Sequence, residues 1–128
     1  YDIDPEATAK AAKNLEGRGL TVVSCRSGQQ AMEGAEIITT CTADKQYATI
    51  LTDNMVGAGE YIKFIGGDCP GKTELHEDIL KRSSIFVEYP PQTRIEGEIQ
   101  QLDDDHPVTE LWRVITFHHW QKMALIMC

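Results

Sequence analysis

The sequence lacks the features that mark membrane, secreted and nucleic-acid-binding proteins. No apolar run approaches the roughly 20 residues that a membrane-spanning helix needs. The opening residues, Tyr1 to Asp4, have neither the basic start nor the apolar core of a secretory signal. Lys and Arg number 12 against 20 Asp and Glu, and the net charge of −8 would repel a phosphate backbone. We therefore expect a cytoplasmic protein that binds neither membranes nor nucleic acids.

Metal-binding patterns are also missing from the sequence. The four cysteines are far apart and include no C-x-x-C pair, which argues against structural zinc and against a disulfide framework. The adjacent His118 and His119 cannot easily turn both rings toward one ion. We therefore expect no metal site.

The sequence does contain β-branched, apolar runs that alternate with helical segments. Strands are predicted at 20–25, 37–41, 61–65 and 84–89. Helices are predicted at 5–16, 28–33, 74–82, 94–102 and 108–117. Asp4 is suited to cap the first helix and Pro5 to open it, and Ile95 and Ile99 are expected to face inward from the fourth. This order of elements predicts an α/β fold with a parallel sheet and right-handed crossovers.

The segment Gly66–Thr73 fits the phosphate-loop pattern G-x-x-x-x-G-K-[ST] between a strand and a helix. Such a loop aims backbone N–H groups at phosphate oxygens and places a lysine on the terminal phosphates. Pro70 would remove one of these donors, and Asp68 would put a negative charge inside the anion cradle. A nucleotide-binding phosphate loop is therefore the alternative hypothesis for this segment.

The other interpretation makes Asp68 the functional group. Asp68 follows a predicted parallel strand, at the edge where open α/β sheets bind their ligands. Gly66 and Gly67 would let a cofactor approach closely. A carboxylate beside a bound nicotinamide could act as general acid or base toward an amino-acid substrate. An ordinary helix or turn cap is the competing explanation for Asp68.

Three further polar residues lie where predicted strands end. Asp2 stands where dinucleotide-binding folds place the acidic residue that binds the adenine ribose, although it could also be a simple cap. Thr40 and Thr42 end the 37–41 strand at the same edge of the sheet, and their hydroxyls or amides could touch a dinucleotide. Threonine is also a common strand residue, so this pattern alone decides nothing.

Several stretches together resemble the ornithine cyclodeaminase/mu-crystallin family, in order from Tyr1 to about Val114. The most specific are Gly-Gly-Asp-Cys-Pro-Gly-Lys-Thr-Glu-Leu at 66–75 and Gln-Thr-Arg-Ile-Glu-Gly-Glu at 92–98. The other matching stretches are 1–9, 38–45 and 48–53. The resemblance strongly disfavours a phosphate loop at 66–73.

The resemblance implies a Rossmann-type domain with tightly bound NAD. The reaction it implies converts L-ornithine to L-proline with loss of ammonia. On this basis Asp68 matches the catalytic carboxylate and Asp2 the ribose-binding acid. Thr40 and Thr42 match the cofactor-lining strand, and Gly66 and Gly67 the glycines beside the cofactor.

Parts of the family pattern are not found in this sequence. The first strand with its G-x-G-x-x-[GAQ] turn and the substrate and dimerisation domain have no counterpart, and 115–128 does not resemble the family. We therefore expect 1–114 to form an incomplete Rossmann-like NAD(P)-binding domain without the first βα unit, and 115–128 an unrelated tail. The chain alone is expected to be inactive and to bind NAD weakly or not at all. An open edge along 37–41 and an apolar tail predict a homo-oligomer.

Overall fold

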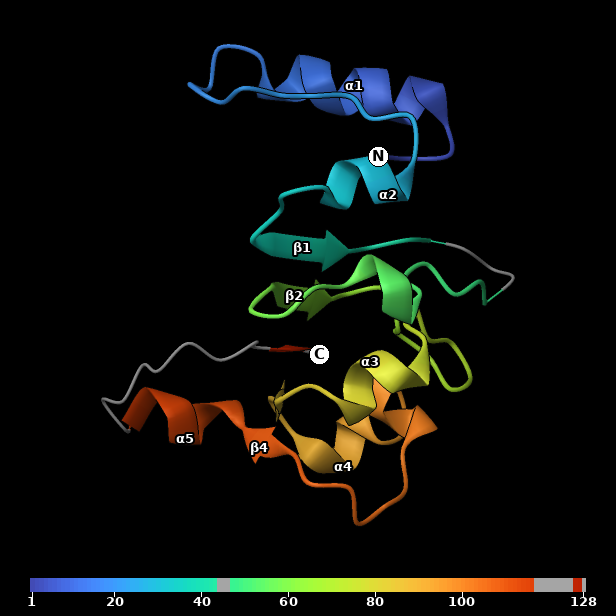
Figure 1. Ribbon diagram of the computed structural model, residues 1–128, viewed down its shortest axis with the longest axis vertical. Coiled ribbons are helices and arrows are strands. Elements are labelled where there is room, and N and C mark those ends of the chain that lie inside the picture. The colour runs from blue at the N-terminus through green and yellow to red at the C-terminus, as the bar shows by residue number, and fades with distance from the viewer. Residues whose placement is uncertain (44–46, 117–125, 128) are drawn as a thin grey trace. The chain divides into compact units, whose positions relative to one another are not determined.

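The computed structural model describes residues 1–43, 47–116 and 126–127 (Figure 1). The chain divides into two compact units, Tyr1–Ala35 and Glu36–Cys128. Each unit is considered by itself. Along the described part of the chain, no helix is both long enough and apolar enough to cross a membrane.

The first unit contains two helices that begin at the polar caps expected from the sequence. Helix α1 spans Pro5–Leu15, and the Asp4 side chain accepts a hydrogen bond from the backbone N–H of Glu6 at 2.8 Å. Helix α2 spans Gly28–Met32, and the hydroxyl of Ser27 accepts from the N–H of Gln30 at 3.1 Å. Both predicted helices are confirmed.

The strand predicted at 20–25 is wrong. This segment contains no strand, and most of its side chains are exposed. Its β-branched residues favour an extended backbone, but a strand also needs a hydrogen-bonded neighbour. No described segment pairs with it.

The second unit is built on a parallel sheet, as predicted. Its strands are β1 (Ile37–Thr40), β2 (Tyr61–Phe64), β3 (Ile85–Val87), β4 (Thr109–Glu110) and β5 (Ile126–Met127). Their order in the sheet is β1-β2-β5-β3-β4, and every pair is parallel. Strands β1 and β2 pair with Thr40 opposite Phe64, so their carboxyl ends lie at one edge of the sheet. In the described sheet β1 is an outer strand, which is where a second copy could pair. The homo-oligomer itself stays a prediction.

Short helices follow the strands. They are η1 (Asp53–Met55), α3 (Glu77–Lys81), α4 (Pro90–Thr93), η2 (Glu98–Gln101) and α5 (Leu111–Thr116). The buried apolar side chains of this unit come from the strands, from the Leu51–Leu75 bridge, from α3 and from η2; they are Ile38, Leu51, Ile62, Phe64, Leu75, Ile79, Leu80, Ile85, Phe86, Val87 and Ile99. Burial of this set provides the main stabilisation of the unit.

Three predicted helices differ from the structure. The helix predicted at 74–82 begins only at Glu77, because Leu75 instead forms a parallel bridge with Leu51. The segment 94–102 is helical only in η2, and Ile95 is 63% exposed rather than buried. The segment 108–117 opens with β4 before α5 begins, and residue 117 lies outside the described residues. In the first and third cases strand pairing with a distant segment overrides local propensity, and in the second the backbone of Gly97, with φ of 122°, interrupts the helix.

The different burial of two isoleucines predicts different costs of truncation. Ile79 is fully buried, so Ile79→Ala is expected to lower the free energy of unfolding by about 2–5 kcal/mol. Ile95 is exposed, so Ile95→Ala should change it by less than about 1 kcal/mol. Urea unfolding of both variants measures the difference. Equal costs would contradict this assignment of the core.

Candidate active site

Asp68 lies in the turn that follows β2, at the carboxyl edge of the sheet. Its N–H donates to the carbonyl of Gly66 at 3.0 Å, and its side chain is 70% exposed. The Lys72 ammonium lies 2.9 Å from Asp68 Oδ1 and also donates to the carbonyl of Thr42 at 3.2 Å. This hydrogen bond, with the charge of Lys72, holds the pKa of Asp68 below its ordinary value and that of Lys72 above it. Asp68 is therefore an exposed, ionised carboxylate at neutral pH.

A second carboxylate, that of Glu74, lies buried behind this turn and is only 1% exposed. Its Oε2 accepts hydrogen bonds from the hydroxyl of Thr40 at 2.5 Å and from the N–H of Gly66 at 3.0 Å. Its Oε1 accepts from the N–H of Thr42 at 2.7 Å and from the hydroxyl of the same residue. One carboxylate thus connects the carboxyl ends of β1 and β2.

A third carboxylate, that of Glu98 at the start of η2, holds the backbone of Glu74. Glu98 accepts from the N–H of Glu74 at 2.7 Å and from the N–H of Leu75 at 3.1 Å, and the amide of Gln101 donates to it at 3.2 Å. Burial raises the pKa of Glu98 to about 7; its two backbone hydrogen bonds oppose the rise, and the nearby charge of Glu74 adds to it.

Carboxylates lie close to both glycines of the turn. A Cβ added at Gly66 would lie 2.0 Å from Glu74 Oε1, a contact that the side chain could not tolerate without moving. A Cβ at Gly67 would meet Glu98 Oε1 at 3.1 Å and the carbonyl of Lys72 at 3.2 Å. Close approach of the Glu74 carboxylate therefore explains Gly66, whereas a side chain at Gly67 would make tight contacts.

The phosphate-loop hypothesis finds no support in the segment 66–73. The N–H groups of Gly66, Asp68, Gly71 and Lys72 donate to protein acceptors, including Gln100 Oε1 at 2.6 Å from Gly71 and the carbonyl of Cys69 at 3.2 Å from Lys72. The lysine side chain is committed to Asp68. No helix begins at the end of the loop, since α3 starts at Glu77. An anion cradle needs free, convergent donors, and the N–H groups of these four residues and the Lys72 ammonium are already used.

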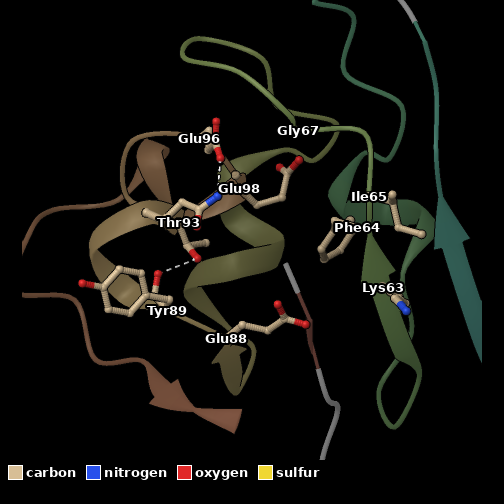
Figure 2. A pocket seen from close by; sticks show the side chains of 11 residues that line it. Lys63, Phe64, Ile65, Gly67, Glu88, Tyr89, Thr93, Glu96 and Glu98 are labelled. Atoms are coloured by element: carbon tan, nitrogen blue, oxygen red, sulfur yellow. Dashed lines mark hydrogen bonds between the residues drawn. The ribbon is translucent and has the colours of Figure 1, made fainter.

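A cavity of about 380 Å³ opens beside Gly67, between the carboxyl ends of β2 and β3 (Figure 2). Figure 2 shows the side chains of Glu88 and Glu98 extending from one side toward Phe64 on the other. The cavity is lined by Lys63, Phe64, Ile65, Gly67, Glu88, Tyr89, Gln92, Thr93, Glu96, Gly97 and Glu98. Even when Glu98 is protonated, the carboxylates of Glu88 and Glu96 outnumber the one lysine, Lys63, so the cavity is better suited to a cationic than to an anionic group.

The structure gathers most of the predicted site residues in one place. Thr40, Thr42 and Gly66 converge on Glu74, and Gly67 and Asp68 continue the same turn. Asp2 belongs to the first unit, where it is exposed and accepts from the N–H of Asp4 at 2.9 Å. The direct cofactor contacts and the catalytic role of these residues stay predictions.

Two central residues, Glu74 and Glu98, were not among the predicted site residues. Both belong to motif stretches that carry the family resemblance, at 66–75 and 92–98. The pattern that could have indicated them is an acidic residue in each stretch beside glycines or turn residues. Their burial, however, depends on contacts between segments 24 residues apart.

Comparisons with known proteins agree on one family. The profile of the ornithine cyclodeaminase/mu-crystallin family matches residues 1–119. Ornithine cyclodeaminase of Brucella melitensis is 72% identical over 116 residues, which are 91% of this chain and 32% of that protein. The chain thus spans about a third of the length of the curated relatives it matches.

Solved structures give the same picture for the fold. A lysine cyclodeaminase, studied for its recognition of L-lysine, L-ornithine and L-2,4-diaminobutyric acid, superposes with a TM-score of 0.79 at 27% identity. The match covers 99% of this chain and 38% of that one. A Δ1-pyrroline-2-carboxylate reductase of Thermococcus litoralis, solved with NADH and L-proline, superposes with a TM-score of 0.82 at 17% identity, over 99% of this chain and 43% of that one.

The Asp68–Lys72 pair predicts a shift in the titration of Asp68. Lys72→Met removes the ammonium and keeps an unbranched apolar side chain, so the pKa of Asp68 is expected to rise toward its ordinary value. A carboxyl-detected NMR titration measures it. Lys81→Met, which removes the partner of Glu77 instead, is the matched control and should leave Asp68 unchanged. An Asp68 titration unaffected by Lys72→Met would contradict the pairing.

Glu98 predicts that stability falls as the pH rises. Its pKa of about 7 in the folded protein exceeds the ordinary value of 4.5, so the folded state binds the proton more tightly than the unfolded state. This contribution is complete below about pH 4.5 and is lost as the pH rises through about 7, with a limit on the order of 3 kcal/mol.

The Glu98→Gln variant isolates this contribution, because it removes the titrating group and keeps the side-chain size. Urea unfolding at pH 5 and pH 8 should show the unvaried chain losing stability relative to Glu98→Gln as the pH increases. The control is Glu110→Gln, which removes a partly exposed carboxylate that lies on the outer strand β4 and pairs with Arg113. Parallel pH curves for the unvaried chain and Glu98→Gln would contradict the prediction.

Proposed function

This chain belongs to the ornithine cyclodeaminase/mu-crystallin family, and on that premise we propose that it supplies the acid–base carboxylate and the nicotinamide side of an ornithine cyclodeaminase active site. The reaction is the conversion of L-ornithine to L-proline with loss of ammonia. The 72% identity to an ornithine cyclodeaminase, within one third of its length, supports this substrate over the other members of the family.

The observation that carries the proposal is the geometry around Asp68. It is an exposed carboxylate in a turn held from behind by Glu74, ionised through Lys72, and adjacent in sequence to a glycine that lines the cavity. An ionised carboxylate at this position can accept a proton from the ammonium group of an amino acid. It can return the proton when ammonia leaves.

The residues at this edge fit a nicotinamide cofactor better than they fit a phosphate group. The acidic cavity beside Gly67 favours a positively charged ring or an ammonium group, and its volume lies within the range of small-molecule sites. Of the two glycines, Gly67 presents backbone without a side chain to this cavity. NAD, when bound, supplies the oxidation and reduction of the substrate's α-carbon.

The individual residues then have distinct roles. Asp68 moves the proton, and Lys72 keeps it ionised between turnovers. Gly67 lines the nicotinamide end, while Thr40, Thr42 and Gly66 donate to Glu74 and line the cofactor only indirectly. Asp2 binds the adenine-ribose hydroxyls. Because the chain spans about a third of its relatives, we propose that it needs further residues, beyond these 128, to complete the reaction.

A chimera provides the test. The 116 matching residues of the Brucella melitensis enzyme are replaced by those of this chain, and proline and ammonia formation from ornithine is measured. The chimera is expected to be active. Asp68→Asn is expected to lower kcat by about 10²–10⁴-fold, because it removes the proton acceptor and preserves the shape.

The control for this test is Asp105→Asn, which neutralises an exposed carboxylate in the loop after η2. It should retain the activity of the unvaried chimera. An inactive chimera, or one in which Asp68→Asn is fully active, would overturn the proposed function.

A further inference from the structure

We infer that Glu74 is a positioning residue for the proposed reaction, because its carboxylate joins the ends of β1 and β2 and thereby determines where the turn presents Asp68. The inference rests on the proposed function and adds a residue to it. Glu74 does not contact the reacting atoms in this role, and it acts through the backbone of the Gly66–Asp68 turn.

The first step concerns the end of the β1–β2 ladder. The last backbone bond of this pair joins the N–H of Ile65 to the carbonyl of Thr40 at 2.9 Å. One residue further along β2 and two along β1, the N–H groups of Gly66 and Thr42 both donate to Glu74. The carboxylate therefore continues the connection between the strands beyond the point where the ladder stops.

The second step concerns the fit of the carboxylate. Each of its oxygens accepts one backbone N–H and one threonine hydroxyl from the described residues. Gly66 leaves room for it, since a Cβ at that position would lie 2.0 Å from Oε1. Charge-assisted hydrogen bonds of this kind, in a buried site, are stronger than neutral ones. The turn is therefore built around Glu74.

The third step concerns the anchoring of Glu74 itself. Its N–H donates to Glu98, and its carbonyl accepts from the N–H groups of Ile50 at 2.6 Å and Leu51 at 3.0 Å. The backbone of Glu74 is thus attached to two other segments of the unit. Because its backbone is held in this way, the Glu74 carboxylate holds the groups that donate to it in fixed positions.

The last step leads to Asp68. Its N–H is bonded to the carbonyl of Gly66, and its carboxylate is bonded to Lys72, which also donates to the carbonyl of Thr42. Both attachments of Asp68 therefore start from residues whose N–H groups Glu74 holds. If Glu74 no longer accepts from Gly66 and Thr42, neither the backbone nor the side chain of Asp68 is held in a fixed position.

The test uses Glu74→Gln in the active chimera. Glutamine has the same shape, but its NH₂ group faces one of the two donor pairs in either orientation, so at least one backbone N–H loses its acceptor. We expect kcat to fall by about 10²-fold, as for a misplaced catalytic group, while KM for ornithine stays within a few-fold. A role limited to stability would leave the kcat of the folded enzyme unchanged.

Two variants of Thr40 provide an independent comparison. Thr40→Ser keeps the hydroxyl that donates to Glu74, whereas Thr40→Val keeps the shape without the donor, so Thr40→Val should lower kcat much more than Thr40→Ser does. Glu77→Gln, an exposed carboxylate three residues after Glu74 that pairs with Lys81, is the matched control. Full kcat in Glu74→Gln, or equal kcat in the two Thr40 variants, would overturn the inference.

A second measurement separates this inference from the proposed function. In the 128-residue chain itself, Glu74→Gln should accelerate amide hydrogen exchange at Gly66 and Asp68 by about 10-fold or more, while amides in α1 are unchanged. Loss of activity in the unvaried chimera would refute the proposed function alone. Unchanged exchange at Gly66 and Asp68 would refute the positioning role whatever the chimera does.

Discussion

The structure of this chain depends on one buried carboxylate and the groups that donate to it. A buried ionised group is strongly destabilising unless its oxygens are fully hydrogen-bonded. Glu74 meets this requirement with two backbone N–H groups and two hydroxyls, all from the ends of β1 and β2. The same bonds satisfy donors that the strand ladder leaves without acceptors. Because the carboxylate and the strand ends satisfy each other, the edge of the sheet where the site lies has a single defined arrangement.

This arrangement explains why a phosphate-loop pattern here has a different role. The glycines, the lysine and the threonine of 66–73 have the spacing of a phosphate loop, but protein groups occupy the positions that an anion would take. The N–H of Gly66 donates to Glu74, the N–H of Gly71 to Gln100, and the Lys72 ammonium to Asp68. A pattern of residue types specifies which donors are present, and the acceptors supplied by the rest of the fold specify what those donors bind.

The carboxylates of the site differ in function according to their exposure. Glu74 and Glu98 are buried and use their oxygens to hold backbone N–H groups, whereas Asp68 is exposed and has a lysine as its partner. The exposed carboxylate of Asp68 can be reached by a ligand, whereas the oxygens of Glu74 and Glu98 are occupied by backbone N–H donors. Acid–base chemistry is therefore assigned to Asp68, and the two glutamates support it.

Local sequence determined those elements whose stabilising groups are close together in the chain. Helix α1 follows from Asp4, Pro5 and a glycine stop, and the strands at 37–40, 61–64 and 85–87 follow from short β-branched runs between turns. The α/β class followed from the alternation of strand and helix patterns, Asp68 from its position after a predicted strand, and the family resemblance from contiguous motifs.

Tertiary structure decided everything that depends on a partner far away in the chain. The segment 20–25 has strand propensity but no pairing strand, and Glu74 and Leu75 leave the predicted helix because Glu98 and Leu51 bind them instead. Ile95 is exposed although its pattern suggested burial. The role of Glu74 could not be read from its neighbours, because the groups that define it are Thr40 and Thr42, more than 30 residues earlier. Hydrogen bonds and packing between such distant segments exist only once the sheet has formed, and for that reason sequence periodicity cannot encode them.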